Sequence, residues 1–355
     1  MPRLRPLDDP APDPVRVLIV DDSAVSRAIL ARMVETTGRF VVVHACASAA
    51  AALDFLAHRS TDVVLLDLQM PGVDGLTALP DVITASGGAK VLVVSSAATA
   101  GAATTVQALA LGAADTLVKP GTGEPTTRFV KVLHDKLRRL ADRSPAPTPA
   151  ASAAPADPLG AAGEGYDVVA VGASTGGIHA LSSMLHEIPR DFPLPIIVTQ
   201  HLPASFMPYF AAQLAVIAGR PCDVAVDRLR IRPGRLIVAP GDAHLRCVRL
   251  PDGGAAIRLS KEPSQSGCIP SVDPMLSSMA DVYGGRMLAV MLSGMGRDGA
   301  IGARDVREAG GGVVVQDRAT SVIWGMPGAV AQGGLAHAVL SPTQIGQLVA
   351  SGRRA

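Results

Sequence analysis

The run VVAVGASTGG, residues 168–177, is the most informative part of this chain. A short apolar strand ends in Ser174, which has glycines on both sides, and helix-like spacing follows over 178–188. A sharp turn from strand to helix lifts a hydroxyl clear of the sheet, beside the positive end of a helix dipole. Acyl-transfer chemistry needs a nucleophile there, although a tight turn or a phosphate-binding loop fits the same Gly-x-Ser-x-Gly pattern.

Length and composition predict a globular protein of two domains. The chain has 355 residues, of which 48% are hydrophobic and 18% charged. A net charge of +1 gives no reason to expect nucleic acid or a membrane surface as a partner. We find no signal-peptide core and no run of about 18 apolar residues, so we expect a cytoplasmic protein without membrane insertion. The cysteines are scattered without metal-ligand or redox spacing, which predicts reduced thiols: Cys46, Cys222, Cys247 and Cys268.

A change in composition separates the two predicted domains. Residues 144–165 are rich in Pro, Ala and Gly and lack periodicity, which is typical of an exposed linker of about 20 residues. We therefore predict a first domain over 14–140, a linker over 141–165 and a second domain over 166–352.

Apolar runs alternate with helix-like stretches on both sides of this linker. Nearly continuous apolar strands between helices predict parallel sheets covered on both faces. The first domain is expected to be a flavodoxin-like (βα)5 unit, with strands at 15–20, 40–45, 63–66, 91–94 and 116–118. The second is expected to be a doubly wound, mostly parallel α/β domain, with strands at 168–171, 196–199, 235–239, 287–291 and 312–315 and a β-hairpin over 245–259.

Polar residues follow the predicted strands of the first domain. The carboxyl ends of parallel strands line one crevice, where such folds bind ligands. Three carboxylates there form an oxygen-only site suited to Mg2+, and a lysine and a hydroxyl add donors for phosphoryl oxygens. These residues are Asp21 and Asp22 after the first strand, Asp67 at the third, Ser95 at the fourth and Lys119 at the fifth.

The run DLQMPGVDG, residues 67–75, is close to the signature of the response-regulator receiver family, which residues 15–135 resemble. The resemblance implies a domain that a histidine kinase phosphorylates. It also implies the roles of the strand-end residues: Asp67 as phospho-acceptor, Asp21 and Asp22 as Mg2+ ligands together with Asp67, Lys119 as a phosphoryl contact and Ser95 as the switch hydroxyl. Receivers commonly carry an aromatic ring where Thr116 stands here.

In the second domain, Ser174 needs a base and the base needs a carboxylate. His201 directly follows a strand and is the first choice as base, with His244 second; His179 and His186 lie on the helix after Ser174. Asp298 lies in a glycine-rich segment whose N–H groups can face an oxyanion. Its competitors as the carboxylate are Asp242, Asp273 and Asp317.

Six motifs in order resemble the chemotaxis protein-glutamate methylesterase family over about residues 166–350. They are GASTGG at 172–177, QHLP at 200–203, APGD at 239–242, PSVD at 270–273, GMGRDG at 294–299 and QDRATSVIWGMP at 316–327. The resemblance implies a catalytic triad of Ser174, His201 and Asp298, with Thr175 and Met295 near the oxyanion. It implies no catalytic-domain cofactor, and as substrate the glutamate γ-methyl esters of chemoreceptor cytoplasmic helices, with glutamine deamidation in some members. Ile269 stands where a basic residue is expected.

Two alternatives stay open on the sequence. The second domain can be a degenerate module that binds receptors or kinase without turnover, or a serine hydrolase of another substrate class. A transcription-factor output is least favoured, because no basic recognition helix is visible.

Overall fold

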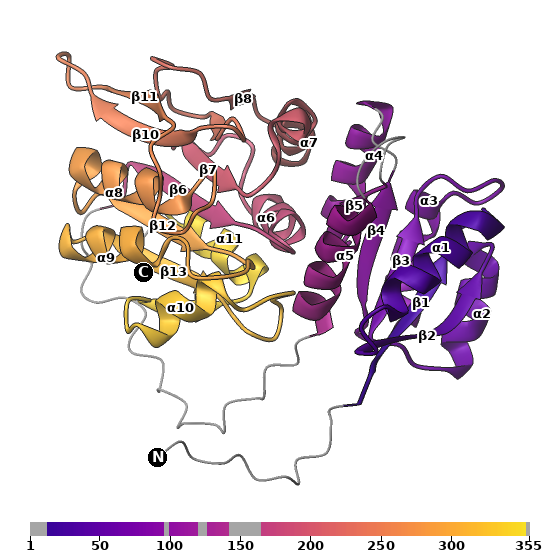
Figure 1. Ribbon diagram of the computed structural model, residues 1–355. Coiled ribbons are helices and arrows are strands. Elements are labelled where there is room, and N and C mark those ends of the chain that lie inside the picture. Colours follow the sequence, from indigo (N-terminus) through magenta and orange to yellow (C-terminus); the bar gives the residue numbers. More distant parts are fainter. Residues whose placement is uncertain (1–12, 96–98, 120–125, 142–164, 353–355) are drawn as a thin grey trace, which may run out of the picture. The chain divides into compact units, whose positions relative to one another are not determined.

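The computed structural model describes residues 13–95, 99–119, 126–141 and 165–352 (Figure 1). They contain two parallel sheets. They divide into two compact units, residues 13–94 with 119 and 126–141, and residues 95 and 99–118 with 165–352, so the last strand of the first sheet groups with the second unit. The predicted linker falls almost entirely outside the described residues, so the proposed domain boundaries stay predictions. Among the described residues, no helix is long and apolar enough to cross a membrane.

The first sheet has five strands in the order β2-β1-β3-β4-β5, the flavodoxin-like order predicted above. β1 pairs in parallel with β2 and β3, and β3 pairs in parallel with β4. The strands are β1 (Val15–Val20), β2 (Phe40–Cys46), β3 (Val63–Asp67), β4 (Lys90–Ser95) and β5 (Asp115–Val118). The helices are α1 (Ala24–Glu35), α2 (Ala49–His58), α3 (Gly75–Ala85), α4 (Thr99–Ala110) and α5 (Thr126–Ala141).

Local sequence explains where the first helices begin. The side chains of Ser23, Ser48 and Asp74 each accept a hydrogen bond from a backbone N–H in the first turn of α1, α2 and α3. α1 packs against α5, and α2 packs against α3. β3, in the middle of the sheet, is buried throughout because helices cover both faces of a parallel sheet, whereas the edge strands β2 and β5 are partly exposed.

The second sheet has seven strands in the order β14-β13-β12-β6-β7-β9-β8, and all of its pairs are parallel. The strands are β6 (Val168–Ala173), β7 (Ile196–Gln200), β8 (Cys222–Val224), β9 (Leu236–Val238), β12 (Met287–Met291), β13 (Gly312–Gln316) and β14 (Ala338–Leu340). Chain order reverses on either side of β6, so the topological switch point lies between β6 and β12.

Helices and a hairpin complete this unit. The helices are α6 (Gly177–His186), the short 3-10 helix η1 (Ala204–Phe206), α7 (Met207–Ala218), α8 (Val272–Tyr283), α9 (Ala300–Glu308), α10 (Met326–Gln332) and α11 (Pro342–Ala350). α6 packs against α7 and α11, whereas α8 packs against α9 and the hairpin. The predicted hairpin is confirmed as β10 (His244–Arg249) and β11 (Ala255–Ser260), which pair antiparallel.

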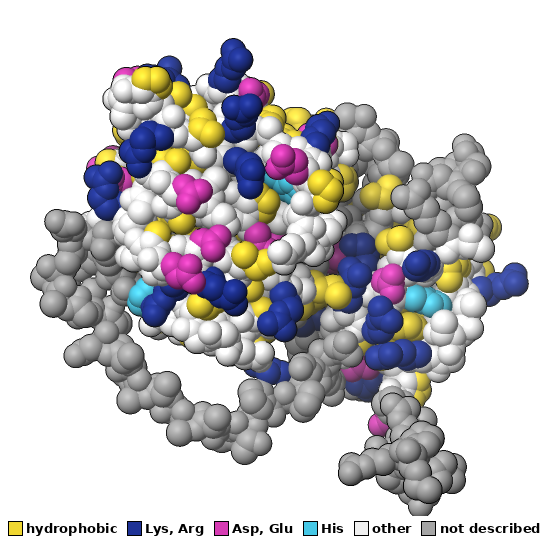
Figure 2. Space-filling model, turned by 60° about the vertical axis from the view of Figure 1, so that its left-hand side comes forward, with side chains coloured by type: hydrophobic (Ala, Val, Ile, Leu, Met, Phe, Trp, Pro, Cys, Tyr) yellow, Lys and Arg dark blue, Asp and Glu magenta, His cyan; other side chains and the backbone are white. Residues whose placement is uncertain are grey.

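One apolar cluster of the second unit lies among the sheet, the hairpin, α8, α9 and α10. It includes fully buried Met275, Leu276 and Met279 of α8 and Leu245 of β10. On the surface shown in Figure 2, basic and acidic side chains are interspersed. Exposed ion pairs such as Arg286 with Asp167, 3.0 Å apart, contribute about 1 kcal/mol or less to stability.

Candidate functional site

Ser174 sits directly after β6, where three backbone hydrogen bonds fix its position. Its N–H donates to the carbonyl oxygen of Ser293 (3.0 Å). Its own carbonyl accepts from the N–H of Gly177 (2.8 Å) and from Nε2 of Gln200 (3.0 Å). The residue that carries the predicted nucleophile is therefore held between β6, β7 and the loop after β12, at the N-terminus of α6.

Gly176 makes this turn possible. It is the N-cap of α6 with φ of 75°, a left-handed conformation that glycine adopts without steric cost. A Cβ at this position would lie 2.4 Å from Cβ of Val322, closer than any real contact allows. The glycine that follows the serine is thus required both by backbone conformation and by space.

His201 occupies the equivalent place on the neighbouring strand. Ala173 of β6 and Gln200 of β7 are partners in the parallel ladder, and the His201 N–H donates to the Ala173 carbonyl (3.1 Å). Ser174 and His201 therefore each directly follow one of two neighbouring parallel strands, whose backbones are about 4.8 Å apart. Among the described residues, no hydrogen bond links the Ser174 hydroxyl to this ring; in enzymes without substrate such bonds are often long.

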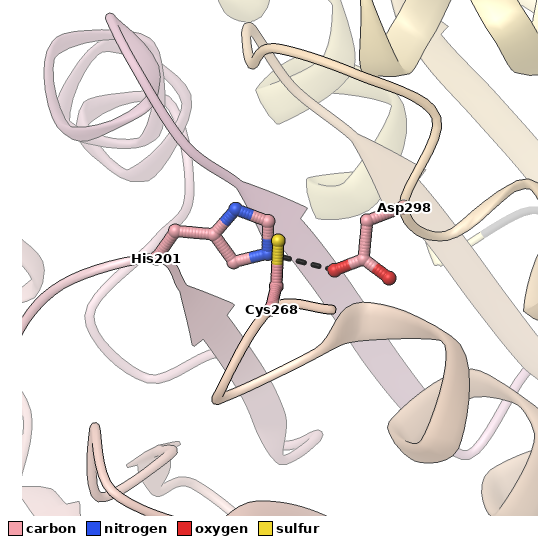
Figure 3. A group of neighbouring side chains, drawn as sticks. All are labelled: His201, Cys268 and Asp298. Carbon is pink, nitrogen blue, oxygen red and sulfur yellow. Dashed lines mark hydrogen bonds and ion pairs between the residues drawn. The ribbon is translucent and has the colours of Figure 1, made fainter. Parts of the chain in front are cut away.

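Asp298 lies in the loop between β12 and α9, and its contact with the imidazole sets the ring's tautomer (Figure 3). Nε2 of His201 is 2.7 Å from Oδ2 of Asp298. A carboxylate only accepts, so Nε2 carries the proton and Nδ1 of neutral imidazole keeps a lone pair. The nitrogen available as a base is therefore Nδ1.

The Asp298 carboxylate is 3% exposed, yet hydrogen bonds keep it ionised. Burial alone would raise its pKa, but the bonds from His201, the Ser271 hydroxyl (2.6 Å) and the Val272 N–H (2.8 Å) outweigh burial and hold the pKa below its usual range. A permanently charged carboxylate fixes the imidazole and stabilises its protonated form.

Ser271 and His244 form hydrogen bonds behind the Asp298 carboxylate, a structural role that the sequence did not predict for either residue. The Ser271 N–H donates to Nδ1 of His244 (3.0 Å), and Nε2 of that ring donates to the carbonyl of Glu262 (2.8 Å). Both nitrogens of His244 are thus used in backbone bonds, and the side chain is buried. This geometry disfavours His244 as the base. The signal available in the sequence was the motif PSVD, which contains Ser271.

Among the described residues, none of the three competing carboxylates bonds to His201. Asp242 pairs with Lys261 (3.3 Å), and Asp317 accepts from the Thr320 N–H (2.7 Å). Asp273, in the first turn of α8, accepts from the Gly302 N–H (2.8 Å). Burial raises the pKa of Asp273 to about 6, helped by the neighbouring charge of Asp298.

The loop after β12 also approaches the serine. An added Cβ on Gly294 would lie 2.9 Å from Cβ of Ser174, so the two backbones are in close contact. Met295 follows in this loop, and the Thr175 carbonyl accepts from the Ser293 hydroxyl (2.8 Å). Within the described chain, no acceptor is found for the backbone N–H of Thr175 or Met295.

In the first unit, the structure brings the predicted acidic residues together. Carboxylate oxygens of Asp21, Asp22 and Asp67 lie within 4.8 Å of one another. Nζ of Lys119 is 2.6 Å from Oδ2 of Asp67 and 3.0 Å from Oδ2 of Asp21. Burial alone would lower the pKa of Lys119, but these two carboxylates outweigh it and raise the pKa. An oxygen-only cluster with one accessible member, Asp22, fits Mg2+, which prefers few protein ligands.

The other predicted switch positions lie on neighbouring strands. Asp67 pairs with Val94 in the β3–β4 ladder, so Ser95 directly follows the strand partner of Asp67 and is buried. Thr116 lies in β5.

These two sites define a class of protein: a phosphate-accepting receiver unit joined to a serine-hydrolase unit of parallel α/β architecture. Comparison with known proteins gives the family. The CheB methylesterase family model matches residues 169–349, and the response regulator receiver domain model matches residues 17–129. The chain belongs to the CheB methylesterase family.

Individual relatives cover both units. A protein-glutamate methylesterase/protein-glutamine glutaminase of Caulobacter vibrioides is 40% identical over 96% of this chain and 99% of its own length. An enzyme of the same name from Azospirillum brasilense is 38% identical over 95% of this chain and 92% of its own length. The crystal structure of the Thermotoga maritima CheB methylesterase catalytic domain has a TM-score of 0.51 and 34% identity, covering 53% of this chain and 99% of that domain.

Proposed function

We propose that this chain is a phosphorylation-regulated serine esterase that hydrolyses glutamate γ-methyl esters on chemoreceptors. The curated relatives are named protein-glutamate methylesterase/protein-glutamine glutaminase, which supports both ester and amide hydrolysis here. The observation that carries the proposal is the 2.7 Å contact between Nε2 of His201 and Oδ2 of Asp298. His201 follows β7, the strand next to β6, which Ser174 follows.

Ser174 is the nucleophile, His201 the general base and Asp298 the orienting carboxylate. Nδ1 of His201 takes the hydroxyl proton as Oγ of Ser174 bonds to the ester carbonyl carbon. The same proton then leaves with the methoxy group as methanol. Water next gives a proton to His201 and hydroxide to the acyl carbon. The bond from that carbon to Oγ then breaks and His201 returns its proton to Oγ, which releases the glutamate and restores the serine and the neutral imidazole. A glutamine substrate would release ammonia by the same sequence.

Backbone donors of Thr175 and Met295 stabilise the tetrahedral oxyanion in this proposal. Their N–H groups flank Ser174 along the chain and across the close contact at Gly294. Loss of one such donor typically costs about 10²–10³ in turnover.

Asp67 accepts the phosphoryl group from a histidine kinase. The cluster of Asp21, Asp22 and Asp67 would hold Mg2+, which supplies charge neutralisation for phosphoryl transfer. Lys119 contacts Asp67 and would donate a hydrogen bond to the added phosphoryl oxygens. Ser95, on the neighbouring strand, would donate its hydroxyl to the phosphoryl group as the switch residue. Phosphorylation adds charge and acceptor oxygens, which can bias a two-state surface of the receiver unit.

The test is methanol release from methylated chemoreceptor membranes, with and without a small phosphodonor. We expect release by the natural chain and a loss of at least about 10³-fold in Ser174→Ala. Ser183→Ala is the matched control, because its hydroxyl donates to the His179 carbonyl in α6 and not to the triad.

Near-native methanol release by Ser174→Ala would refute this assignment. Receptor binding by the natural chain without methanol release would favour the non-enzymatic alternative. Hydrolysis of other esters or peptides with intact receptor methyl esters would favour a serine hydrolase of another substrate class.

A further inference from the structure

Cys268 lies beside the catalytic histidine and aspartate, although the sequence showed no metal-ligand spacing. One nitrogen of His201, Sγ of Cys268 and one oxygen of Asp298 all lie within 4.8 Å of one another. Figure 3 shows the three side chains converging from different segments of the chain. All four cysteines belong to the described chain, and none of them forms a disulfide. His201 and Cys268 are partly exposed, so solvent ions have access.

The segment that carries the thiol is fixed by hydrogen bonds. The Ser264 hydroxyl donates to the Cys268 carbonyl (3.0 Å), and the Cys268 N–H donates to the Ser266 hydroxyl (3.3 Å). The Ser266 hydroxyl in turn contacts the hydroxyl of Ser271 (3.2 Å), which binds Asp298. The backbone of Cys268 and the Asp298 carboxylate thus belong to one continuous network, which positions the segment that carries the thiol beside the carboxylate. The thiol itself donates to the Ser266 carbonyl (3.9 Å).

The donor set selects the kind of cation. Thiolate, imidazole and carboxylate are the ligands of Zn2+, whereas Mg2+ prefers oxygen alone. Three protein ligands leave a fourth tetrahedral position for water. The chain therefore carries two chemically different clusters: the oxygen-only group of Asp21, Asp22 and Asp67, and this mixed group.

We propose that His201, Cys268 and Asp298 bind Zn2+ or a similar borderline-soft divalent cation, and that this binding reversibly inhibits the esterase. The inhibitory part rests on the function proposed above, whereas the binding itself does not. The Cys268 thiol releases its proton to solvent and Sγ becomes a ligand. The cation takes the place of the proton between Nε2 of His201 and Asp298.

Coordination through Nε2 removes the base. Neutral imidazole that binds a cation through Nε2 carries its proton on Nδ1. Nδ1 then has no lone pair for the proton of Ser174, so the nucleophile is not activated. The cation also neutralises the carboxylate that stabilises the protonated ring. Inhibition therefore needs no contact between the cation and the serine.

The binding test uses the full, tag-free chain titrated with Co2+ in excess Mg2+, which occupies the acidic cluster of the receiver unit. We expect one equivalent of Co2+ to produce a thiolate-to-cobalt charge-transfer band in the natural chain, displaced by Zn2+. Cys268→Ser should lose the band. Cys222→Ser is the matched control and should keep it, because that thiol lies in β8 and, among the residues that the structure describes, belongs to no such cluster. Absence of the band in the natural chain, or its persistence in Cys268→Ser, would overturn the site.

The inhibition test measures methanol release against free Zn2+, with each variant normalised to its own rate in chelator. The natural chain and Cys222→Ser should lose activity and recover it with chelator, and Cys268→Ser should need at least about tenfold more Zn2+. Activation by Zn2+, or an unchanged rate at concentrations that saturate the band, would overturn the inhibitory role. If no chain releases methanol even in chelator, the proposed function fails while the cobalt band still reports on the site.

Discussion

Both oxygens of the Asp298 carboxylate accept hydrogen bonds from within the protein, so its position does not depend on the imidazole alone. Oδ1 accepts from the Ser271 hydroxyl, and Oδ2 accepts from the Val272 N–H as well as from His201. Charge-assisted bonds of this kind are about twice as strong as neutral ones. The carboxylate is therefore already oriented before a substrate arrives, and Ser271 acts as a positioning residue.

Replacement of Ser271 by alanine tests that role. Loss of one bond to a buried carboxylate should weaken the orientation of His201 and lower kcat by about tenfold, equivalent to about 1.4 kcal/mol. KM should change little, because Ser271 is not proposed to touch the substrate. Ser183→Ala, whose hydroxyl donates only within α6, is the control for methanol release and Tm. An unchanged kcat in Ser271→Ala, or an equal loss in Ser183→Ala, would contradict the positioning role.

Asp273 should make stability depend on pH. Its pKa is about 6 in the folded chain against 3.8 for the ordinary group. Between these values the folded state binds more protons than the unfolded state, so the free energy of unfolding falls as pH rises through this window. Asp273→Asn should thus raise Tm at pH 7.5, by an amount equivalent to about 1–3 kcal/mol, with the gain vanishing near pH 4.

Asp281→Asn, at an exposed position of the same helix, is the control for this measurement. Thermal unfolding of both variants should be followed across pH 4 to 7.5. A lower Tm for Asp273→Asn at pH 7.5 would show that its bond to Gly302 outweighs the cost of its buried charge.

The sequence allowed only part of this site to be predicted. Ser174 and His201 were predictable because each directly follows an apolar strand, and the carboxyl ends of parallel strands lie at one edge of the sheet. Ser271 and Cys268 were not, because their contacts depend on how the segment between β11 and α8 folds back over the sheet edge. That fold is set by serine hydroxyl bonds that have no periodic signal.

The turn from β6 to α6 requires glycine at position 176. Gly176→Ala should lower the free energy of unfolding, because alanine is strained in the left-handed conformation and its Cβ would clash with Val322. Gly253→Ala is the matched control, because Gly253 has φ of 83° with open space around it. The control should lose about 1–2 kcal/mol, and Gly176→Ala clearly more, as measured by denaturant unfolding. Equal losses of unfolding free energy in the two variants would show that Val322 moves aside without an energetic cost.

The element pattern itself was largely predictable. Buried strands of five or six residues, such as β6 and β12, gave continuous apolar runs, and the hairpin gave alternation around a glycine-rich turn. β8 and β14 were not predicted. Each has three residues that are not fully buried and lies at an edge of the sheet, so neither leaves a distinct apolar run.

The acidic cluster of Asp21, Asp22 and Asp67 and the hydrolase site around Ser174 lie in different compact units of the chain. Coupling them needs little energy, because a tenfold change in the active population corresponds to about 1.4 kcal/mol. We propose that the unphosphorylated receiver unit restrains the esterase and that phosphorylation at Asp67 relieves the restraint. Two variants separate this from the alternative in which the receiver unit activates directly.

Deletion of residues 1–143 should raise basal methanol release and abolish its response to a phosphodonor, because the restraint and its control are removed together. Asp67→Asn should keep the low basal rate of the full chain and also lose the response, because an amide cannot accept the phosphoryl group. The T. maritima CheB methylesterase catalytic domain, 34% identical, has a crystal structure of its own, which motivates this fragment. Circular dichroism confirms folding before the rates are compared. A folded fragment with an unchanged or lower rate would mean that the receiver unit acts by activation, and the restraint would be rejected.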